Sequence, residues 1–298
     1  MKTILRRTAP EILATALAAF TVISPVSRAH QQSTSQQGQQ QRPQQQQPQQ
    51  QQPAKPGEQG QAPPNGQAPA EAPKVDPAEE KAYKDFTDLK ADDYDKQIQA
   101  GEEFVKKYPQ SKYNAFVYSR LSSAYFNKQQ LDKMYEVSDK ALALNPNDVS
   151  VLVLVGWVIP HNINPNDAES DRRLAKAEGY EKHALEVIPT LPRPDNVTDE
   201  QFAAAKSREE ATAHSGLGLI YFRQQKSEDS LKELQQATAK DQSDPVDFFI
   251  MGVDLTSLKR YNDAADAFQK CAQTPGAMQD RCKQQAEKAK AEAAQSPK

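Results

Sequence analysis

The sequence predicts an all-α fold in which helix–turn–helix repeats follow one another along the chain. One observation is a pattern in which a large residue is followed by a leucine or methionine, then by a small residue, and then by an aromatic residue or a leucine. This pattern recurs, and Leu217 and Met251 are separated by 34 residues, as are Gly218 and Gly252. A second observation is that each such stretch is followed by an amphipathic segment with a small residue near its centre. The third is composition, since 11 glycines and one tryptophan fit poorly with a β-sandwich or a glycine-rich nucleotide fold.

Composition and charge narrow the classes of function. The 298 residues include 37 Lys+Arg and 40 Asp+Glu, which gives a formal net charge of -3. A nucleic-acid binder would carry a basic excess, so no nucleic-acid partner is expected. Hydrophobic residues make up only 37% of the chain, because three unlike segments are averaged together.

Residues 1–29 predict an export signal. Lys2, Arg6 and Arg7 form a positive start, residues 12–26 are mainly apolar, and small residues precede a cleavage point after Ala29. The apolar stretch is shorter than the ~20 residues that span a bilayer as a helix. We therefore expect cleavage and export to the periplasm or beyond, with an uncleaved anchor as the alternative. Because no cysteine lies near the cleavage point, a lipoprotein is not expected.

Residues 30–74 predict a disordered Gln/Pro-rich linker. Positions 31–74 contain 18 glutamines and 8 prolines, and no Val, Ile, Leu, Met, Phe, Trp or Tyr. Such a segment buries nothing that would offset the ordering of its backbone. The prolines favour extended states, so the segment is interpreted as a solvated tether. A ligand for a proline-binding partner is the functional alternative.

The folded part, residues 75–298, opens with two repeat units. In the first, about 77–110, the regular register would bury Lys84, Asp85 and Asp88, so we interpret it as a divergent capping repeat. The second runs from Tyr118 to Pro146 and is regular.

The third unit is irregular. The run 149–158 is rich in valine and would suit a strand by propensity alone, but the flanking repeats favour a helix. The spacing that follows is longer than in the other units, which predicts a loop insertion near 160–170.

Two more units and a final helix complete the chain. Thr198 with Gln201 predicts a capping box that opens a helix running to about Arg223, some three turns longer than its counterparts. The fifth unit contains Phe248 to Cys271. Residues 279–294, rich in Ala, Lys, Gln and Glu, predict a solvating cap helix.

The units resemble the tetratricopeptide repeat (TPR) family, whose 34-residue helix–turn–helix pattern they match. The resemblance implies a solenoid of about five repeats, the first and third irregular. The ending Tyr108-Pro109-x-Ser111 is similar to the first repeats of exported, periplasmic TPR proteins of bacterial type. The places that match the family are Leu121, Tyr125, Ala141 and Pro146 in one unit, Leu217, Gly218, Tyr221 and Ala237 in another, and Gly252, Ala264 and Phe268 in a third.

This resemblance also implies a ligand groove on the concave side, lined by the first helix of each unit. The groove would suit an extended or helical peptide with apolar anchors. The alternative is that these residues, which recur at helical spacing, pack between repeats. The basic and Asn residues of carboxylate-binding TPR domains are missing from these places. The implied peptide-binding groove consists of Phe116, Ser119, Ser123, Phe126, Val153, Trp157, His161, Ser215, Leu219, Phe222, Arg223, Phe249 and Val253.

Residues that carry chemistry are few, so no enzymatic activity, cofactor or metal site is expected. The four histidines, His30, His161, His183 and His214, form no metal-binding or catalytic array. His214 is interpreted as a packed core residue. The segment after His161 lacks the alternating acids and central glycine of a calcium loop.

Cys271 and Cys282 are the only cysteines. In an oxidising compartment they could form one bond, with the cap helix doubling back so that their Cα atoms approach about 5.5–6 Å. The alternative is two small apolar core residues.

Taken together, the sequence suggests a non-enzymatic scaffold of the cell envelope that binds a protein or peptide partner through the groove. A self-associating structural component, and thus a homo-oligomer, is one alternative. An accessory subunit of an envelope enzyme complex, with the insertion as its contact, is another. No membrane span is expected after signal cleavage.

Overall fold

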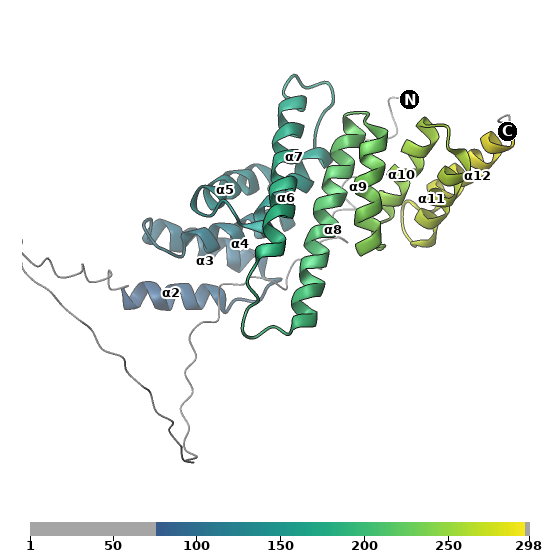
Figure 1. Ribbon diagram of the computed structural model, residues 1–298. Helices are drawn as coiled ribbons and strands as arrows, with labels where there is room; N and C mark the ends of the chain where they lie inside the picture. The colour runs from purple at the N-terminus through teal and green to yellow at the C-terminus, as the bar shows by residue number, and fades with distance from the viewer. Residues whose placement is uncertain (1–75, 296–298) are drawn as a thin grey trace, which may run out of the picture.

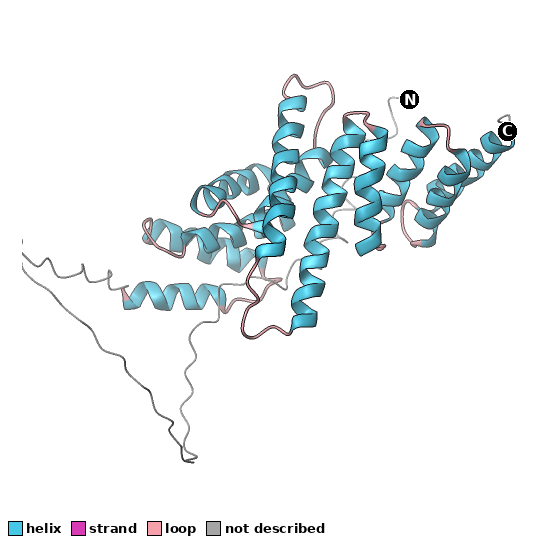
Figure 2. Ribbon diagram, in the orientation of Figure 1, coloured by secondary structure: helices cyan, strands magenta, loops and turns pink. Residues whose placement is uncertain are grey.

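The computed structural model describes residues 76–295, which form helices and connecting turns without any strand (Figures 1 and 2). The export signal (1–29) and linker (30–74) lie outside the described residues. The helices are α2 (Pro77–Thr87), α3 (Tyr94–Lys107), α4 (Asn114–Asn127), α5 (Leu131–Leu144), α6 (Val149–His161), α7 (Ser170–Val187), the 3₁₀ turn η2 (Ile188–Thr190), α8 (Asp199–Arg223), α9 (Ser227–Lys240), α10 (Pro245–Ser257), α11 (Tyr261–Gln273) and α12 (Gln279–Gln295).

The helices pack as five successive pairs plus a last helix. Each of α4, α6, α8 and α10 packs against the helix that follows it, and α4, α6 and α8 also contact the first helix of the next pair. Figure 1 shows the pairs stacked along one direction, with α2 near one end and α12 at the other. The all-α solenoid predicted from the sequence is therefore confirmed. Because each pair buries its apolar face on its neighbours, no single large core is needed.

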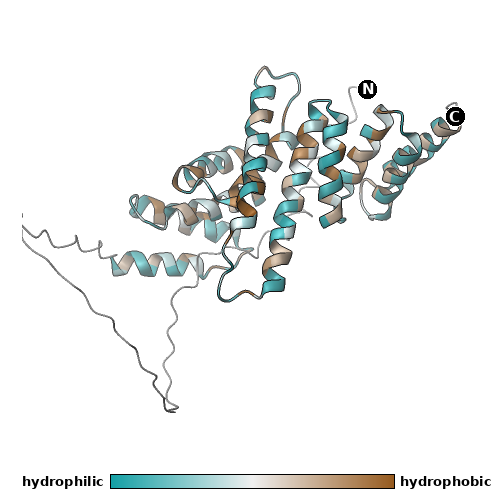
Figure 3. Cartoon of the chain, in the orientation of Figure 1, coloured by the Kyte–Doolittle hydropathy of each residue, from teal (hydrophilic) through white to brown (hydrophobic). Residues whose placement is uncertain are grey.

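Apolar side chains gather between the pairs rather than at one centre. The largest group lies where α3, α4, α5 and α6 meet and includes Phe104, Leu121, Tyr125 and Trp157. A second group, around Ile159, Leu217 and Ile220, joins α6, α7 and α8. In Figure 3, by contrast, α9 and α12 present mostly hydrophilic residues to the viewer.

The valine-rich run forms helix α6, not a strand. Asp148 caps this helix, its carboxylate accepting a bond from the Val151 amide at 3.2 Å. Every residue from Val151 to Pro160 is buried, because α4, α5, α7 and α8 all contact this helix. Burial on all sides explains why the run lacks an amphipathic pattern. The following loop covers residues 162–169, since Pro160 and His161 complete the last turn of α6.

Helix α8 begins where the sequence predicts. The Thr198 hydroxyl accepts a bond from the Gln201 amide at 3.2 Å, and the Gln201 side chain accepts one from the Thr198 amide at 3.1 Å. This capping box satisfies two backbone donors at the helix start. With 25 residues, α8 extends well beyond α6 and α10.

The first pair follows its own register. Phe86 is the buried residue of α2, whereas the charged residues that the regular register would bury are exposed. Asp85 pairs with Lys81 at 2.6 Å, and Asp88 pairs with Lys84, so each pair spans one helical turn. Helix α2 therefore departs from the repeat pattern by burying Phe86 and leaving its charged side chains exposed to solvent.

Three turns between paired helices share one backbone conformation. Gln129, Gln225 and Lys259 have φ values of 58°, 60° and 59°. The amide of the residue after each one bonds back to the helix, for example Lys226 N to Tyr221 O at 2.9 Å. This left-handed closure satisfies carbonyls that the helix end leaves free.

Helix α12 doubles back on α11. A disulfide joins Cys271 of α11 to Cys282 of α12, with Cα atoms 5.8 Å apart. Both cysteines are buried beside Phe248 and Met278. Farther along α12, Ala286 and Ala289 pack with Phe268, so the helix closes the last repeat with its apolar stripe.

Candidate functional site

The residues predicted to line a groove all lie on α4, α6, α8 and α10, the first helices of four pairs. We call the set of predicted residues on these helices the first-helix face. These helices contact one another in succession. The predicted positions thus lie on four helices that contact one another in succession, and burial divides them into two groups.

Five predicted groove residues are buried in the packing between repeats. Val153 is fully buried, and Trp157 is only 5% exposed. Neither presents a surface to a ligand in this conformation, so the alternative of inter-repeat packing describes them better than the groove interpretation. The buried group is Phe126, Val153, Trp157, Ser215 and Leu219.

Trp157 is held by aromatic neighbours. Its ring centroid lies 3.9 Å from that of His161 and 6.3 Å from that of Phe126, the latter in an edge-to-face arrangement. The His161 Nδ1 atom hydrogen-bonds to the Trp157 carbonyl oxygen at 2.7 Å. These contacts fix the last turn of α6 at the entrance to the 162–169 loop.

The second group keeps part of its surface open. Phe249 lies on α10, where its ring packs edge-on against Phe268 at 5.6 Å and the guanidinium of Arg281 lies 4.4 Å from its centroid. Helix α12 therefore partly covers this end of the first-helix face. The partly exposed group is Phe116, Ser119, Ser123, His161, Phe222, Arg223, Phe249 and Val253.

Burial lowers the pKa values of two side chains at the contact between α6 and α8. Desolvation lowers the pKa of His161 to about 4, an effect that the nearby Arg223 increases. Desolvation also lowers the pKa of Arg223, whose Nε donates to the Pro160 carbonyl oxygen at 3.2 Å. At neutral pH His161 is therefore an uncharged ring that packs at a tilt against Trp157.

Serines of the first-helix face bond to acids at the start of the next first helix. Ser215 of α8 donates to Asp247 of α10 at 2.6 Å. Burial raises the pKa of Asp148, and a hydrogen bond with Ser119 of α4 partly opposes that effect. Both serines were predicted from the family register, whereas their acidic partners were not.

A carboxyl cluster, made of Asp148, Glu181 and Glu209, lies where α6, α7 and α8 meet. Glu181 is fully buried, and neither of its carboxyl oxygens has a hydrogen-bond partner. Burial and then the charge of Glu209 raise its pKa well above the usual range. Burial and then Asp148 raise the pKa of Glu209 to about 7. The three acids therefore act on one another from three helices.

Sequence reasoning missed this cluster, although one signal was present. The buried stripe of α7 is Leu174, Ala177, Glu181, Ala184 and then Ile188 after the helix ends. Glu181 thus stands at an apolar position of a helical pattern, where a charged residue is unusual.

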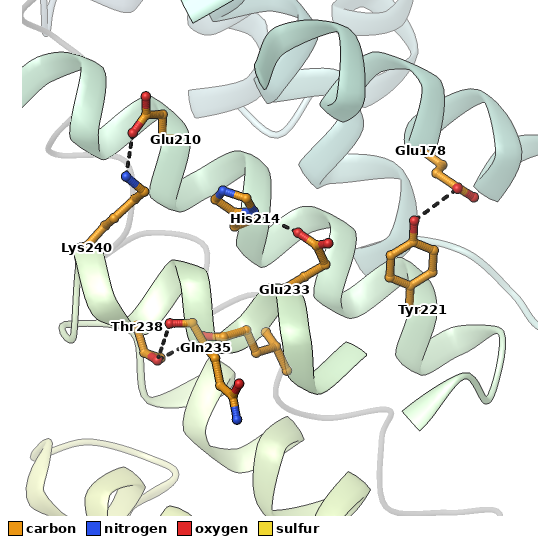
Figure 4. A network of polar contacts seen from close by, with 9 residues as sticks. Glu178, Glu210, His214, Tyr221, Glu233, Gln235, Thr238 and Lys240 are labelled. Atoms are coloured by element: carbon orange, nitrogen blue, oxygen red, sulfur yellow. Dashed lines mark hydrogen bonds and ion pairs between the residues drawn. The ribbon is translucent and has the colours of Figure 1, made fainter. Parts of the chain in front are cut away.

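Helices α8 and α9 are joined by ordinary polar pairs (Figure 4). The His214 Nδ1 and a Glu233 carboxylate oxygen lie 2.7 Å apart, and Lys240 pairs with Glu210 at 2.5 Å. His214 is only partly buried and hydrogen-bonds to Glu233, so it links two helices rather than packing wholly within the core. The same view shows Tyr221 donating to Glu178 of α7 at 3.1 Å.

Residues 76–295 lack two further kinds of feature. In that part of the chain, no three His, Cys, Asp or Glu side chains come close enough to hold a metal ion. Over the same residues, no helix has the length and apolar character that crossing a membrane requires.

The fold and its repeated pairs define a helical solenoid protein. The tetratricopeptide repeat family profile matches residues 117–148, which cover most of α4 and all of α5. Residues 117–148 of this chain therefore match a tetratricopeptide repeat.

Other comparisons add a structural relative. TTC0263, a thermophilic TPR protein in Thermus thermophilus, is similar at 17% sequence identity and a TM-score of 0.44. The similarity covers 72% of this chain and 99% of that one. No curated protein matches the chain. The TPR fold supports a role as a protein–protein interaction scaffold in general.

Proposed function

We propose that this protein is a non-enzymatic scaffold of the cell envelope that is exported by residues 1–29 and binds a protein or peptide partner through the first-helix face. The observation that carries the proposal is the presence of partly exposed aromatic side chains on three of the four first helices, with Phe116 on α4, Phe222 on α8 and Phe249 on α10. Aromatic side chains spaced along the repeats can serve as anchor contacts for an extended or helical peptide.

The test is a crosslinking pulldown that compares surface variants of the exported protein. Phe222→Ala and Phe116→Ala remove partly exposed rings, while Leu144→Ala removes apolar surface from α5, where Leu144 is 57% exposed. We expect the two phenylalanine variants to lose the crosslinked partner and the leucine variant to retain it. Equal recovery with all three would contradict the proposal. Trp157 is unsuitable for this test because truncating a buried tryptophan destabilises the fold.

Export has its own measurement. The mature N-terminus of protein recovered from outside the cytoplasm is expected to begin at His30, and a chain retaining residues 1–29 would favour the anchored alternative.

A further inference from the structure

The cluster of Asp148, Glu181 and Glu209 has no positive charge of its own. Within residues 76–295, no lysine, arginine or histidine forms an ion pair with any of the three. The lysines of α8 and α9 in this region are engaged elsewhere, since Lys206 donates to the Pro189 carbonyl oxygen and Lys240 pairs with Glu210. Hydrogen bonds from the Val151 amide and from Ser119 offset part of the desolvation cost at Asp148, whereas the buried oxygens of Glu181 and the Oε2 atom of Glu209 have no such partner.

Orphaned oxygens sit inside the cluster. Both carboxyl oxygens of Glu181 and the Oε2 atom of Glu209 are buried without a partner. Glu181 points between α6 and α8, where its carboxyl group contacts Gly156 and Gly216, and the charge of Glu209 acts on it directly. These oxygens are unused hydrogen-bond acceptors, and an acceptor left unpaired inside a protein favours any donor that reaches it.

Access comes from the outer two members of the cluster. Asp148 and Glu209 are partly exposed, whereas Glu181 is closed off beneath them. Asp148 stands at the start of α6 beside Ser119, a residue of the first-helix face. The cluster therefore adjoins the surface that the proposed function assigns to the partner.

The donor that fits is a basic side chain rather than a metal ion. The acids of residues 76–295 are nowhere grouped to ligate a metal. An ammonium group needs no fixed coordination shell and offers three hydrogen-bond donors, and its charge would offset the carboxylates in a partly desolvated setting. We infer that the partner inserts a lysine side chain at Asp148 and Glu209. This inference rests on the proposed function and names the chemistry of its ligand.

Acidic residues whose pKa values are raised by burial also lie at the start of α10. Asp247 is buried, and burial followed by the charges of Asp244 and Asp241 raises its pKa well above the usual range. A basic segment that runs from the start of α6 past the middle of α8 to the start of α10 would meet both groups of acids. The positive charges of such a segment would then complement the acidic residues along its path.

The test uses three labelled peptides and the full chain. Acetyl-(Lys-Gly)4-amide is the basic probe; its counterparts carry Glu or Phe in place of Lys. Fluorescence anisotropy at fixed salt is measured for wild type, Glu209→Gln and Asp148→Asn, the last retaining a residue that caps helices well. The control is Glu228→Gln, which removes one charge from an exposed position of α9. Circular dichroism checks that each variant is folded.

The expected result is preferential binding of the basic peptide, weakened about fivefold or more by Glu209→Gln and Asp148→Asn but not by the control. Binding should strengthen from about pH 5.5 to 8 as Glu209 ionises, and this pH dependence should disappear in Glu209→Gln. Equal weakening in all variants, or no preference for the basic peptide, would overturn the inference. Binding of the Phe peptide alone would overturn it while leaving the proposed function standing. Failure of every peptide, together with an empty pulldown, would count against both.

Discussion

Gly156 and Glu181 share one small space between α6 and α7. A Cβ atom added to Gly156 would lie 2.6 Å from the Oε1 atom of Glu181, closer than real side chains pack. Gly216 of α8 faces the same carboxyl group from the other side. The two glycines form the walls of a cradle around a buried acid, and this fixes how closely the third and fourth repeats approach.

The cradle predicts opposite effects for two glycine-to-alanine substitutions. Gly156→Ala should lower the free energy of unfolding by about 1–3 kcal/mol, because the added methyl group must displace Glu181 or its helix. Gly179→Ala lies in the same repeat, inside α7, and an added Cβ there meets nothing within 4 Å. It should raise stability by about 0.5–1 kcal/mol through helix propensity. Urea unfolding curves of both variants give the comparison.

A double-mutant cycle tests whether the loss of stability in Gly156→Ala comes from a steric clash with Glu181. In a Glu181→Ala background the carboxyl group is gone, so Gly156→Ala should cost much less there than in wild type. The same cost in both backgrounds would mean that the cradle is not the reason for the loss.

Glu209 predicts a pH dependence of stability. Its pKa is about 7 in the folded protein against an ordinary value of 4.5. The folded state thus holds a proton that the unfolded state has released. The stabilisation is complete below pH 4.5 and is lost as pH rises from there through 7. Glu209→Gln cannot ionise, so its stability relative to wild type should grow by roughly 2–3 kcal/mol between about pH 4.5 and 8.

The measurement compares unfolding free energies at several pH values. Taking the difference between variant and wild type is necessary because His161 acts in the opposite sense. Its lowered pKa of about 4 removes stability as pH falls below 6.5. Glu210→Gln is the matched control, since Glu210 already has Lys240 as its partner. A difference for Glu209→Gln that does not change with pH would contradict the assignment of the titration to this residue.

The fold was predictable because repetition makes local signals agree. The capping box at Thr198 and Gln201, the long helix that follows and the reversal at Cys282 each rest on short-range patterns, and the structure shows all three features. The sequence predicted that α2 departs from the regular repeat register, because that register would bury three charged residues. It did not indicate which residue α2 would bury instead. Phe86 fills that place.

The candidate site was harder to predict, since burial depends on neighbours far along the chain. Family register placed Val153 and Trp157 on the first helices. It could not show that Val153 would pack in a cluster with Ala184 and Ala213, or that Trp157 would pack against Phe126 of α4. The carboxyl cluster joins Asp148, Glu181 and Glu209 across more than 60 residues of sequence. No local pattern connects such positions, and only the break in the apolar stripe of α7 marked one of them.

The left-handed turns predict a stabilising substitution. Gln225 has a φ of 60°, a conformation that costs a side-chain-bearing residue energy and suits glycine. Gln225→Gly should therefore raise the melting temperature, by the equivalent of about 0.5–1 kcal/mol. The control is Gln235→Gly on the exposed face of α9, which should lower stability by about 1 kcal/mol. Thermal unfolding followed by circular dichroism measures both, and destabilisation by both variants would mean that the turn is not strained.

The bond between Cys271 and Cys282 predicts that reductant weakens the last repeat. It closes a loop with a sequence separation of 11, so its loss should cost roughly 2–3 kcal/mol by restoring freedom to the unfolded chain. Helix α12 should loosen first, because apart from Cys282 its buried side chains are the small Ala286 and Ala289. Thiol titration of denatured protein isolated without reductant should find no free thiol, and hydrogen exchange with reductant should show faster exchange in α12 than in α4. A Cys271→Ala, Cys282→Ala variant should not respond to reductant. Two free thiols in exported protein would show that the bond does not form there.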